Sequence, residues 1–556
     1  MSTIRPLNIS VNESDQSVWV DAGVKTIDLL TFLRHHVTPK APAGYTLAAF
    51  PWFVYQSVAG AVATGTHGSS MEHNSMSNQV LALDVILANG TRRTFTNKTD
   101  PFLMRAFRVS VGKLGILARV QFCIVPEVPV RRVLKVYTPT ELLALMKDAS
   151  ASYVANGSIP HWMNETQIFW VVQKNQFLAV SFLRADSADP SEAAAALQNY
   201  RPDNTTVFSK KGDLLALGEL IIPADAHANV SSGQIVITPP EGSAADAEPY
   251  VRAQRWLDGF LSREVNPAVP AAKNDSESAR TVGARWVLPK PKAASVFYGA
   301  SNMAEGLNEV SRLGIQTVAG NLTAEPAAIY IHQPRATLSQ LQTVLYDQYE
   351  LQTVLYDQYE VSIPLSAMGS CWAKLLDVVY QGDLEGTNSI IRPLDKGFRT
   401  APLIRFINKE DGLLSHTGDG PRMYLNIEDY LFYNTGRKTN PEFKKVMAAL
   451  TADPACTSQG PPRLHWGKAG WPDPGCWHGD AMFGDNWCHF GCAVQQLDPT
   501  GKFADSAPDR WTWQGVDLDK CCGAEGFKAG VEGCACKVQH ARSMEQCGAA
   551  PFYTYR

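Results

Sequence analysis

Alternation between apolar and polar positions divides the first part of the chain into short strands and amphipathic helices. Residues 17–33 alternate and then take on a helical period, which predicts a strand, a glycine turn and a helix. Strands are also predicted over 80–88, 91–96 and 116–125, and the Asn-Gly pair at 89–90 is typical of a hairpin turn. From about residue 131 the pattern changes to mixed helix and strand.

One decapeptide occurs twice in tandem. LQTVLYDQYE fills 341–350 and recurs without change at 351–360. Its spacing of apolar residues favours a helix, in which the two copies would point about 80° apart. The copies would then face different neighbours, and we assign the repeat no function.

Size and charge narrow the class of protein. The 556 residues predict two or three domains, and 45% apolar with 19% charged residues is enough to bury a sizeable core. A net charge of −4 without basic clusters argues against a nucleic-acid partner. We find no apolar stretch of about 18 residues, so no spanning helix is expected.

Two features point to the secretory route: the asparagine acceptor sequences and the clustered cysteines. Residues 1–5 do not form a signal peptide, yet ten of the 23 asparagines stand in Asn-x-Ser/Thr acceptor sequences. These are Asn8, Asn12, Asn89, Asn97, Asn156, Asn164, Asn204, Asn229, Asn274 and Asn321. We therefore expect a secreted or membrane-associated glycoprotein and a chain that begins after its true start.

The cysteines are concentrated near the C-terminal end. Nine of the eleven lie between Cys456 and Cys547. Disulfides are the favoured interpretation, and a zinc knot is the alternative, although the Cys-Cys and Cys-x-Cys spacings differ from the usual Cys-x₂-Cys of zinc sites. Because eleven cysteines cannot all pair, Cys123 on a core strand is expected to be free.

A glycine-rich segment at 58–70 is the most informative motif. Its glycines allow close backbone approach and its hydroxyls can donate, so it could cradle a pyrophosphate. A tightly packed turn would have the same composition. The residues in question are Gly60, Gly65, Gly68, Thr64, Thr66, Ser69 and Ser70.

A second small-residue turn at 109–121 runs into a predicted strand. Together GAVATGTHGSS and VSVGKLGIL resemble the second half of the PCMH-type flavin domain of the vanillyl-alcohol oxidase superfamily. The resemblance implies that both turns lie along FAD. The residues expected to bind it are Gly60, Ala61, Thr64, Gly65, Thr66, His67, Gly68, Ser69, Ser70, Gly112, Gly115 and Ile116.

Two later motifs narrow the resemblance. Residues 463–468 (RLHWGK) are similar to the His-Trp-Gly/Ala-Lys motif of aldonolactone oxidases, and 497–503 (LDPTGKF) to their closing segment. The cysteine-rich tail resembles that of plant gulonolactone oxidase-like proteins. This implies FAD-dependent oxidation of a gulono-, galactono- or arabinono-1,4-lactone, by hydride transfer to flavin N5, with oxygen as acceptor and hydrogen peroxide as product.

The resemblance also implies the domain organisation. We expect an α+β chain with a PCMH-type FAD-binding domain lacking its N-terminal part, an α/β cap domain with an antiparallel sheet, and a cysteine-rich tail. The expected ranges are 1–127 for the flavin domain, 128–459 for the cap, 460–513 for a segment returning to the flavin domain, and 514–556 for the tail.

The expected catalytic residues are Lys468, Arg405 and His465. Lys468 would stabilise the negative charge of reduced flavin, and Arg405, costly to bury without a partner, would polarise the substrate oxygen. His465 could donate to flavin or substrate, or pack its motif. The family's Glu-x-Arg strand has Leu403 in place of its acid, so the proton acceptor is open. Asn426 and Glu428 are weak candidates for it.

Further expectations concern cofactor and partners. The resemblance implies that family members carry an earlier phosphate-binding loop, so chain 1–556 is expected to bind FAD weakly or not at all, and without a covalent histidine link. No metal and no nucleic acid are expected, whereas peripheral membrane association is. The rival interpretations are an alditol or other carbohydrate oxidase and a non-catalytic secreted glycoprotein. The oxidase interpretation requires Lys468 to lie beside the 65–68 bend.

Overall fold

The computed structural model describes most of the two ends of the chain and separated pieces of its middle. The described residues are 8–51, 56–171, 176–197, 227–231, 234–238, 325–326, 357–382, 384, 402–429, 441–468, 476, 478–504 and 511–540.

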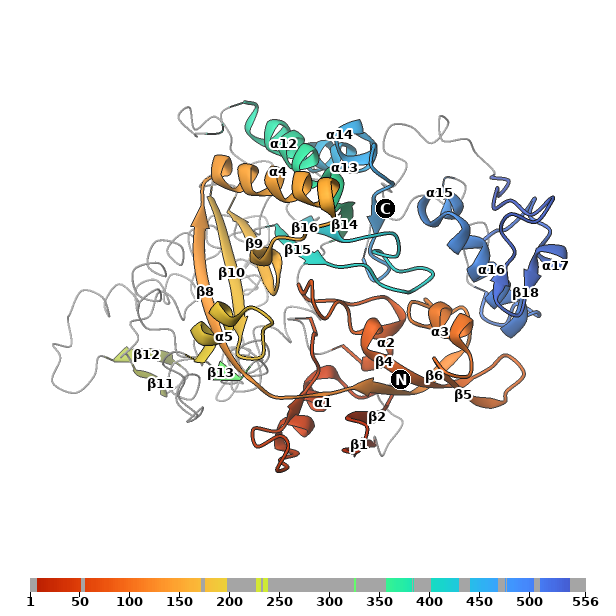
Figure 1. Ribbon diagram of the computed structural model, residues 1–556, viewed down its shortest axis with the longest axis horizontal. Coiled ribbons are helices and arrows are strands. Elements are labelled where there is room, and N and C mark those ends of the chain that lie inside the picture. The colour runs from red at the N-terminus through yellow and green to blue at the C-terminus, as the bar shows by residue number, and fades with distance from the viewer. Residues whose placement is uncertain are drawn as a thin grey trace, which may run out of the picture.

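A five-stranded sheet forms the first half of the structure, at the bottom of Figure 1. In spatial order its strands are β1 (Ile9–Asn12), β2 (Ser17–Asp21), β6 (Ile116–Cys123), β4 (Val80–Ile86) and β5 (Arg92–Thr96). Its helices are α1 (Thr26–His35), α2 (Val58–Ala63) and α3 (Pro101–Phe107). β7 (Val125–Pro126), which follows β6 in the chain, pairs with β3 (Tyr45–Thr46).

The apolar pattern predicted these elements well. The strand and helix expected in 17–33 are β2 and α1, and the three strands expected between 80 and 125 are β4, β5 and β6. Gly90 has φ of +82°, and its amide donates to the Leu87 carbonyl, so the predicted hairpin turn is confirmed. Alternating residues such as Val18, Val20 and Val120 are fully buried and form the core beneath the sheet.

An antiparallel eight-stranded sheet forms the second half, above the first in Figure 1. Its spatial order is β13 (Glu325–Pro326), β8 (Pro129–Tyr137), β10 (Gln176–Arg184), β9 (Thr166–Val171), β15 (Leu403–Ile407), β16 (Arg422–Asp429), β14 (Asp357–Pro364) and β17 (Arg463–Leu464). The expected α+β class and the antiparallel cap sheet are therefore confirmed. We call this half the cap.

Two long helices cover the cap sheet. α4 (Pro139–Asn156) and α12 (Leu365–Tyr380) pack on each other and on the sheet (Figure 1). α4 begins with a capping box in which the Thr138 hydroxyl accepts from the Glu141 amide. Trp170 and Trp372 meet edge-on beneath the helices, with ring centroids 5.0 Å apart. The other cap helices are α5 (Pro190–Leu197), α13 (Pro441–Ala452) and α14 (Pro454–Thr457).

The predicted helix over the decapeptide repeat is wrong where the structure describes it. The end of the second copy, 357–360, begins strand β14, while the rest of both copies lies outside the described residues. Polar Gln358, Glu360 and Ser362 alternate there with apolar Tyr359, Val361 and Ile363. This period of two is a strand signal that the helical spacing upstream obscured.

The C-terminal part returns to the first half and is held by disulfides. Lys502 donates to the Ala88 carbonyl at 2.7 Å, which joins the end of α16 (Asp485–Leu497) to the β4–β5 hairpin. α15 (Gly479–Phe483) precedes α16, and α17 (Leu518–Cys521), β18 (Cys522–Gly523) and β19 (Gly526–Phe527) follow it. None of the described helices is long and apolar enough to cross a membrane.

The disulfide interpretation of the cysteines is confirmed for those that the structure describes. Two bridges tie the tail to α16, one lies within the tail, and one joins α12 to α14 in the cap. They are Cys488–Cys536, Cys492–Cys522, Cys521–Cys534 and Cys371–Cys456. Cys476 is also bridged, and Cys123 is a free thiol as predicted. Zinc ligation by these thiolates is thereby excluded, since a bridged sulfur is no longer a thiolate ligand.

Candidate active site

The glycine-rich segment forms helix α2 followed by a tight bend. Gly65 has φ of +69°, and a Cβ at this position would lie 3.0 Å from the His416 ring. A Cβ at Gly68 would lie 2.6 Å from the Phe50 carbonyl oxygen. These two glycines are therefore required by close packing of the bend, which turns the side chain of His67 towards the cap.

Hydroxyl groups of the bend attach it to the cap. The Ser69 hydroxyl donates to the Thr166 carbonyl and accepts from the Phe406 amide at 3.0 Å. The Ser70 hydroxyl donates to the Glu165 carboxyl at 2.7 Å. Expected as phosphate donors, these two side chains instead hold the bend against strands β9 and β15. Thr64 lies nearer the helix, where its hydroxyl donates to the Gly60 carbonyl at 2.9 Å.

Three neighbouring cap strands place an acid and a cation on one face. Leu403 on β15 lies opposite Asn426 on β16, which in turn lies opposite Glu360 on β14. Arg405 is two residues beyond Leu403, so its side chain is on the same face. The guanidinium of Arg405 pairs with the Glu360 carboxylate and donates to the His67 carbonyl at 3.0 Å.

Leu403 stands where the Glu-x-Arg pattern has an acid, and a carboxylate from another strand takes the place of that acid. Glu360 is 1% exposed and supplies the carboxylate that pairs with Arg405. Sequence reasoning missed Glu360 because it lies in the repeat, which we expected to be helical and without function.

The HWGK motif follows edge strand β17. The His465 amide donates to the Glu360 carbonyl at 3.0 Å, which fixes the motif beside β14. The Nδ1 atom of His465 accepts from the Gly467 amide at 3.0 Å, and its ring stacks on His416 with centroids 4.7 Å apart. His465 therefore packs its own motif, which was one of the two roles expected for it. The Lys468 ammonium donates to the Gln358 side chain.

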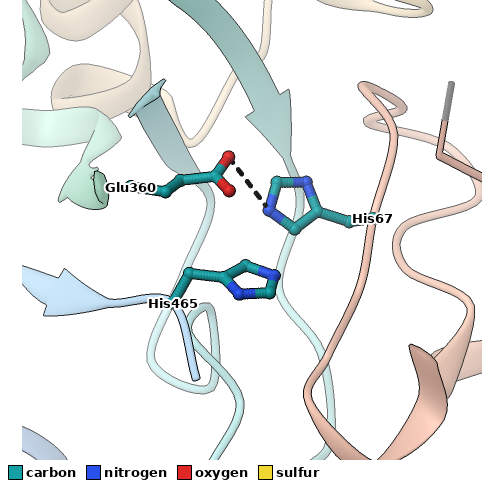
Figure 2. Close-up of side chains that lie close together, drawn as sticks. All are labelled: His67, Glu360 and His465. Atoms are coloured by element: carbon teal, nitrogen blue, oxygen red, sulfur yellow. Dashed lines mark ion pairs between the residues drawn. The ribbon is translucent and has the colours of Figure 1, made fainter. Parts of the chain in front are cut away.

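Side chains from both halves and from the returning segment meet in one buried cluster. Figure 2 shows His67 from the bend, Glu360 from β14 and His465 from the residues after β17 pointing towards one another. His67 Nε2 lies 3.5 Å from Glu360 Oε1, and the rings of His67 and His465 are 5.4 Å apart. The requirement that Lys468 lie near the 65–68 bend is satisfied, since the charge of Lys468 acts on His67 within the bend.

Burial and charge set the protonation states of the cluster. Burial lowers the pKa of His67 to about 4, with the charge of Arg405 acting in the same direction and Glu360 opposing it. Burial would raise the pKa of Glu360, but Arg405, His67 and Lys468 outweigh it and hold this pKa at about 2. At neutral pH the cluster therefore contains a carboxylate and a neutral His67.

Hydrogen bonding assigns the tautomer of His67. Its Nδ1 lies 2.8 Å from the Gly68 carbonyl, an acceptor, so Nδ1 carries the proton and Nε2 is an acceptor. Nε2 faces Glu360, which also only accepts. Within the described residues, His67 Nε2, Glu360 Oε2, Arg405 Nε and Asn426 Oδ1 are buried without a hydrogen-bond partner. A polar ligand that both donates and accepts hydrogen bonds would satisfy these atoms.

A metal ion is a poorer occupant of this cluster. One ligand atom each from His67, Glu360 and His465 lie within 4.8 Å of one another, which is close enough to surround an ion. However, Glu360 is already neutralised by Arg405, and Lys468 contributes a further positive charge. An additional cation would be repelled by these positive charges, whereas a neutral polyol would form hydrogen bonds with the atoms that have no partner.

The second small-residue turn lies against the first. The Val111 amide donates to the Ala63 carbonyl at 2.9 Å, and Val109 packs on Gly65. Gly112 has φ of +75° with open space where a Cβ would be, and Ile116 is 48% exposed. A Cβ at Gly115 would lie 2.5 Å from Val85, so this glycine is required by packing.

The remaining expected residues are more scattered. Gly60 is exposed at the first turn of α2, and Ala61 is buried in the core, while the Thr66 hydroxyl lies 3.3 Å from that of Thr64. Asn426 lies on the same cap-sheet face as Glu360, and the backbone of Glu428 is opposite Gln358.

Two contacts, one made by a histidine and one by a tyrosine, were not predicted from the sequence. His416 stacks on His465, and Tyr424 lies 4.2 Å from the His67 ring, both fully inside the cluster. Burial lowers the pKa of His416 to about 3 and raises the pKa of the Tyr424 hydroxyl well above its usual value. Tyr424 could have been found from its strand, because it lies two positions before Asn426 on the same face. His416 lies in a loop with no periodic signal.

Residues 3–96 match the family described as FAD binding domain. This match contains strands β1 to β5 and the glycine-rich bend. D-arabinono-1,4-lactone oxidase of Saccharomyces cerevisiae is 32% identical over 126 residues, which is 23% of each chain. The putative D-arabinono-1,4-lactone oxidase of Neurospora crassa is 35% identical over 118 residues, covering 21% of this chain and 20% of that protein.

About a fifth of this chain is similar to aldonolactone oxidases.

L-gulonolactone oxidase of Bos taurus extends this relationship, with 28% identity over 119 residues, 21% of this chain and 26% of the bovine protein. The similarity to these three aldonolactone oxidases thus spans only 20% to 26% of their own length. A solved structure titled solvent-stable cholesterol oxidase shares the fold, with a TM-score of 0.52 at 13% identity over 92% of this chain and 85% of that one. The expected PCMH-type flavin domain with an antiparallel cap is confirmed.

Proposed function

We propose that this protein oxidises an aldono-1,4-lactone, with FAD bound between the bend of the flavin domain and the cap sheet. The observation that carries the proposal is the facing pair of acceptors, His67 Nε2 and Glu360 Oε1, 3.5 Å apart beside two cationic side chains. A hydroxyl group on the substrate would supply the missing donor. The relationship to lactone oxidases favours a lactone over other alcohols.

FAD fits the residues that surround the cluster. The bend at 64–68 and the turn at 109–115 would hold it, and Arg405 and Lys468 suit the negative charge that a reduced flavin carries. When bound, FAD would supply the hydride acceptor. Oxygen as the final acceptor, with hydrogen peroxide as product, is the corresponding part of the proposal for the overall reaction.

The protein's own residues would orient the substrate and take up its proton. Arg405, fixed by Glu360 and the His67 carbonyl, would donate to the substrate oxygen. Neutral His67 would accept the hydroxyl proton at Nε2 as the C–H bond is broken, and the neighbouring Glu360 carboxylate would stabilise the resulting imidazolium. Residues buried on every side exclude water from this transfer.

His67→Gln tests the proposed proton transfer. With added FAD and gulono-, galactono- or arabinono-lactone, we expect kcat to fall about 10²- to 10⁴-fold, because an amide cannot take up the proton. His35→Gln, at an exposed position in α1, is the matched control and should retain full activity. Unchanged lactone oxidation by the His67 variant, measured as peroxide released, would refute this role.

A further inference from the structure

The acceptor sequences for N-linked glycans occupy two kinds of position in the folded chain. Seven of them lie in the described residues: Asn229 lies within strand β11 (His227–Ser231), and the other six have side chains of known exposure. In five, both the asparagine and the hydroxyl residue two positions later are exposed: Asn8 with Ser10, Asn12 with Ser14, Asn89 with Thr91, Asn97 with Thr99, and Asn156 with Ser158. In the sixth, Asn164 is half-buried and Thr166 is 1% exposed.

Four of the exposed acceptors bracket the two outermost strands of the flavin-domain sheet as its described residues form it. In the order β1-β2-β6-β4-β5, the edge strands are β1 and β5. Asn8 immediately precedes β1 and Asn12 ends it. Asn89 lies in the turn that leads into β5, and Asn97 immediately follows that strand. Among the described strands, no inner strand of this sheet is flanked in this way.

An open edge is a hazard that proteins cover. The unpaired amides and carbonyls of an edge strand can pair with another chain and start aggregation. A bulky, hydrated glycan at each end of the strand would prevent a second strand from approaching. The bridged cysteines are an independent sign of an oxidising compartment, where such glycans are attached.

We infer that both edges of the flavin-domain sheet are N-glycosylated, at the Asn8/Asn12 pair on β1 and the Asn89/Asn97 pair on β5. In this reaction the asparagine Nδ2 attacks the anomeric carbon of a lipid-diphosphate-linked oligosaccharide. A new N–C1 bond forms, the C1–O bond to the diphosphate breaks, and the amide loses one proton as the lipid diphosphate leaves. No electron is transferred.

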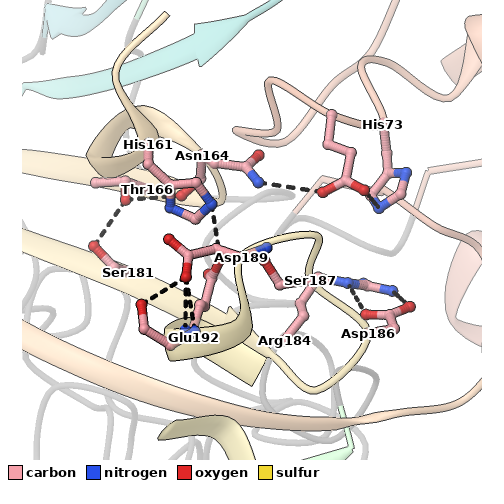
Figure 3. Close-up of polar contacts among 12 residues, drawn as sticks. His73, His161, Asn164, Thr166, Ser181, Arg184, Asp186, Ser187, Asp189 and Glu192 are labelled. Atoms are coloured by element: carbon pink, nitrogen blue, oxygen red, sulfur yellow. Dashed lines mark hydrogen bonds and ion pairs between the residues drawn. The ribbon is translucent and has the colours of Figure 1, made fainter. Parts of the chain in front are cut away.

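Asn164 provides an internal control in the same chain. Its Nδ2, the atom that a glycan would occupy, donates to the Glu72 carboxylate at 3.3 Å. Thr166 is bonded to the Ser181 hydroxyl at 2.7 Å (Figure 3). Both lie at the junction of bend and cap, where a glycan would separate the two halves. Asn164 is therefore unmodified in the folded protein.

Peptide mass spectrometry of the protein purified from its natural source tests the inference. Digestion with peptide N-glycosidase in ¹⁸O water turns each glycosylated asparagine into an ¹⁸O-labelled aspartate. We expect this label on the peptides of both edges and none at Asn164. Unlabelled peptides from either edge, or label at Asn164, would overturn the proposal.

A variant series in a secretory eukaryotic host separates glycan loss from misfolding. Thr91→Ala removes the Asn89 acceptor, so the protein should lose one glycan and migrate faster in electrophoresis. Thr91→Ser keeps the acceptor and should migrate like the unaltered protein. Asn89→Gln combined with Asn97→Gln should remove both glycans from the β5 edge and increase light scattering on storage. Equal mobility of the Thr91→Ala and Thr91→Ser variants would also overturn the proposal.

Discussion

At the scale of single residues, Glu360 makes the greatest difference to the site. Leu403 leaves the position of the family's acid apolar, and Glu360 from another strand reaches the same guanidinium. The carboxylate also faces His67 at 3.5 Å. One side chain thus keeps Arg405 paired and sets the charge around the proposed proton acceptor.

Glu360→Gln should weaken the fold as well as the reaction. Removing one partner of a buried pair leaves Arg405 with an uncompensated charge, so the free energy of unfolding is expected to fall by about 3–5 kcal/mol. Denaturant unfolding of this variant measures the loss, and Glu532→Gln, exposed in the tail, is the control. A Glu360 variant as stable as the control would show that the pair contributes little.

At the scale of elements, the junction between bend and strand β9 depends on Glu165. This residue has φ of +47°, and its buried carboxyl accepts from the Ser70 hydroxyl near Arg184, Glu72 and Glu192. Figure 3 shows the polar network in which Arg184 is held by Asp186. Burial raises the pKa of Glu165 to about 7.

This raised pKa predicts a pH dependence of stability. The folded chain holds the Glu165 proton more tightly than the unfolded chain, so its stabilising effect is complete below pH 4.5 and is lost as pH rises through about 7. Glu165→Gln stays neutral, so its unfolding midpoint should fall less than that of the wild type between these pH values. Parallel midpoint curves for the two proteins, followed by circular dichroism, would contradict the assignment.

Strand β14 also differs from what the sequence predicted. Its first four residues are the end of the second repeat copy, and they include Gln358 and Glu360 of the site. Removing one ten-residue copy leaves a single LQTVLYDQYE directly before Val361, so the described strand keeps its sequence. We expect the shortened protein to retain its unfolding midpoint and lactone oxidation. Loss of either would show that both copies are needed.

At the scale of the whole molecule, local pattern predicted the elements and motifs, but long-range register determined the site. Period-two alternation predicted β4 to β6, and the HWGK motif and Arg405 were found from their sequence. Glu360 could not be found in this way, because its partner Arg405 is 45 residues away and on a non-adjacent strand. The use of Ser69 and Ser70 to hold the cap likewise depends on contacts that no local pattern encodes.

Anaerobic mixing of the purified protein and added FAD with an aldono-1,4-lactone tests the proposed chemistry most directly. We expect the flavin absorbance near the visible maximum to bleach with lactone and to return when oxygen is admitted, and to bleach far more slowly in the His67→Gln protein. If FAD binds but none of the gulono-, galactono- and arabinono-lactones bleaches it, this chain is not a lactone oxidase.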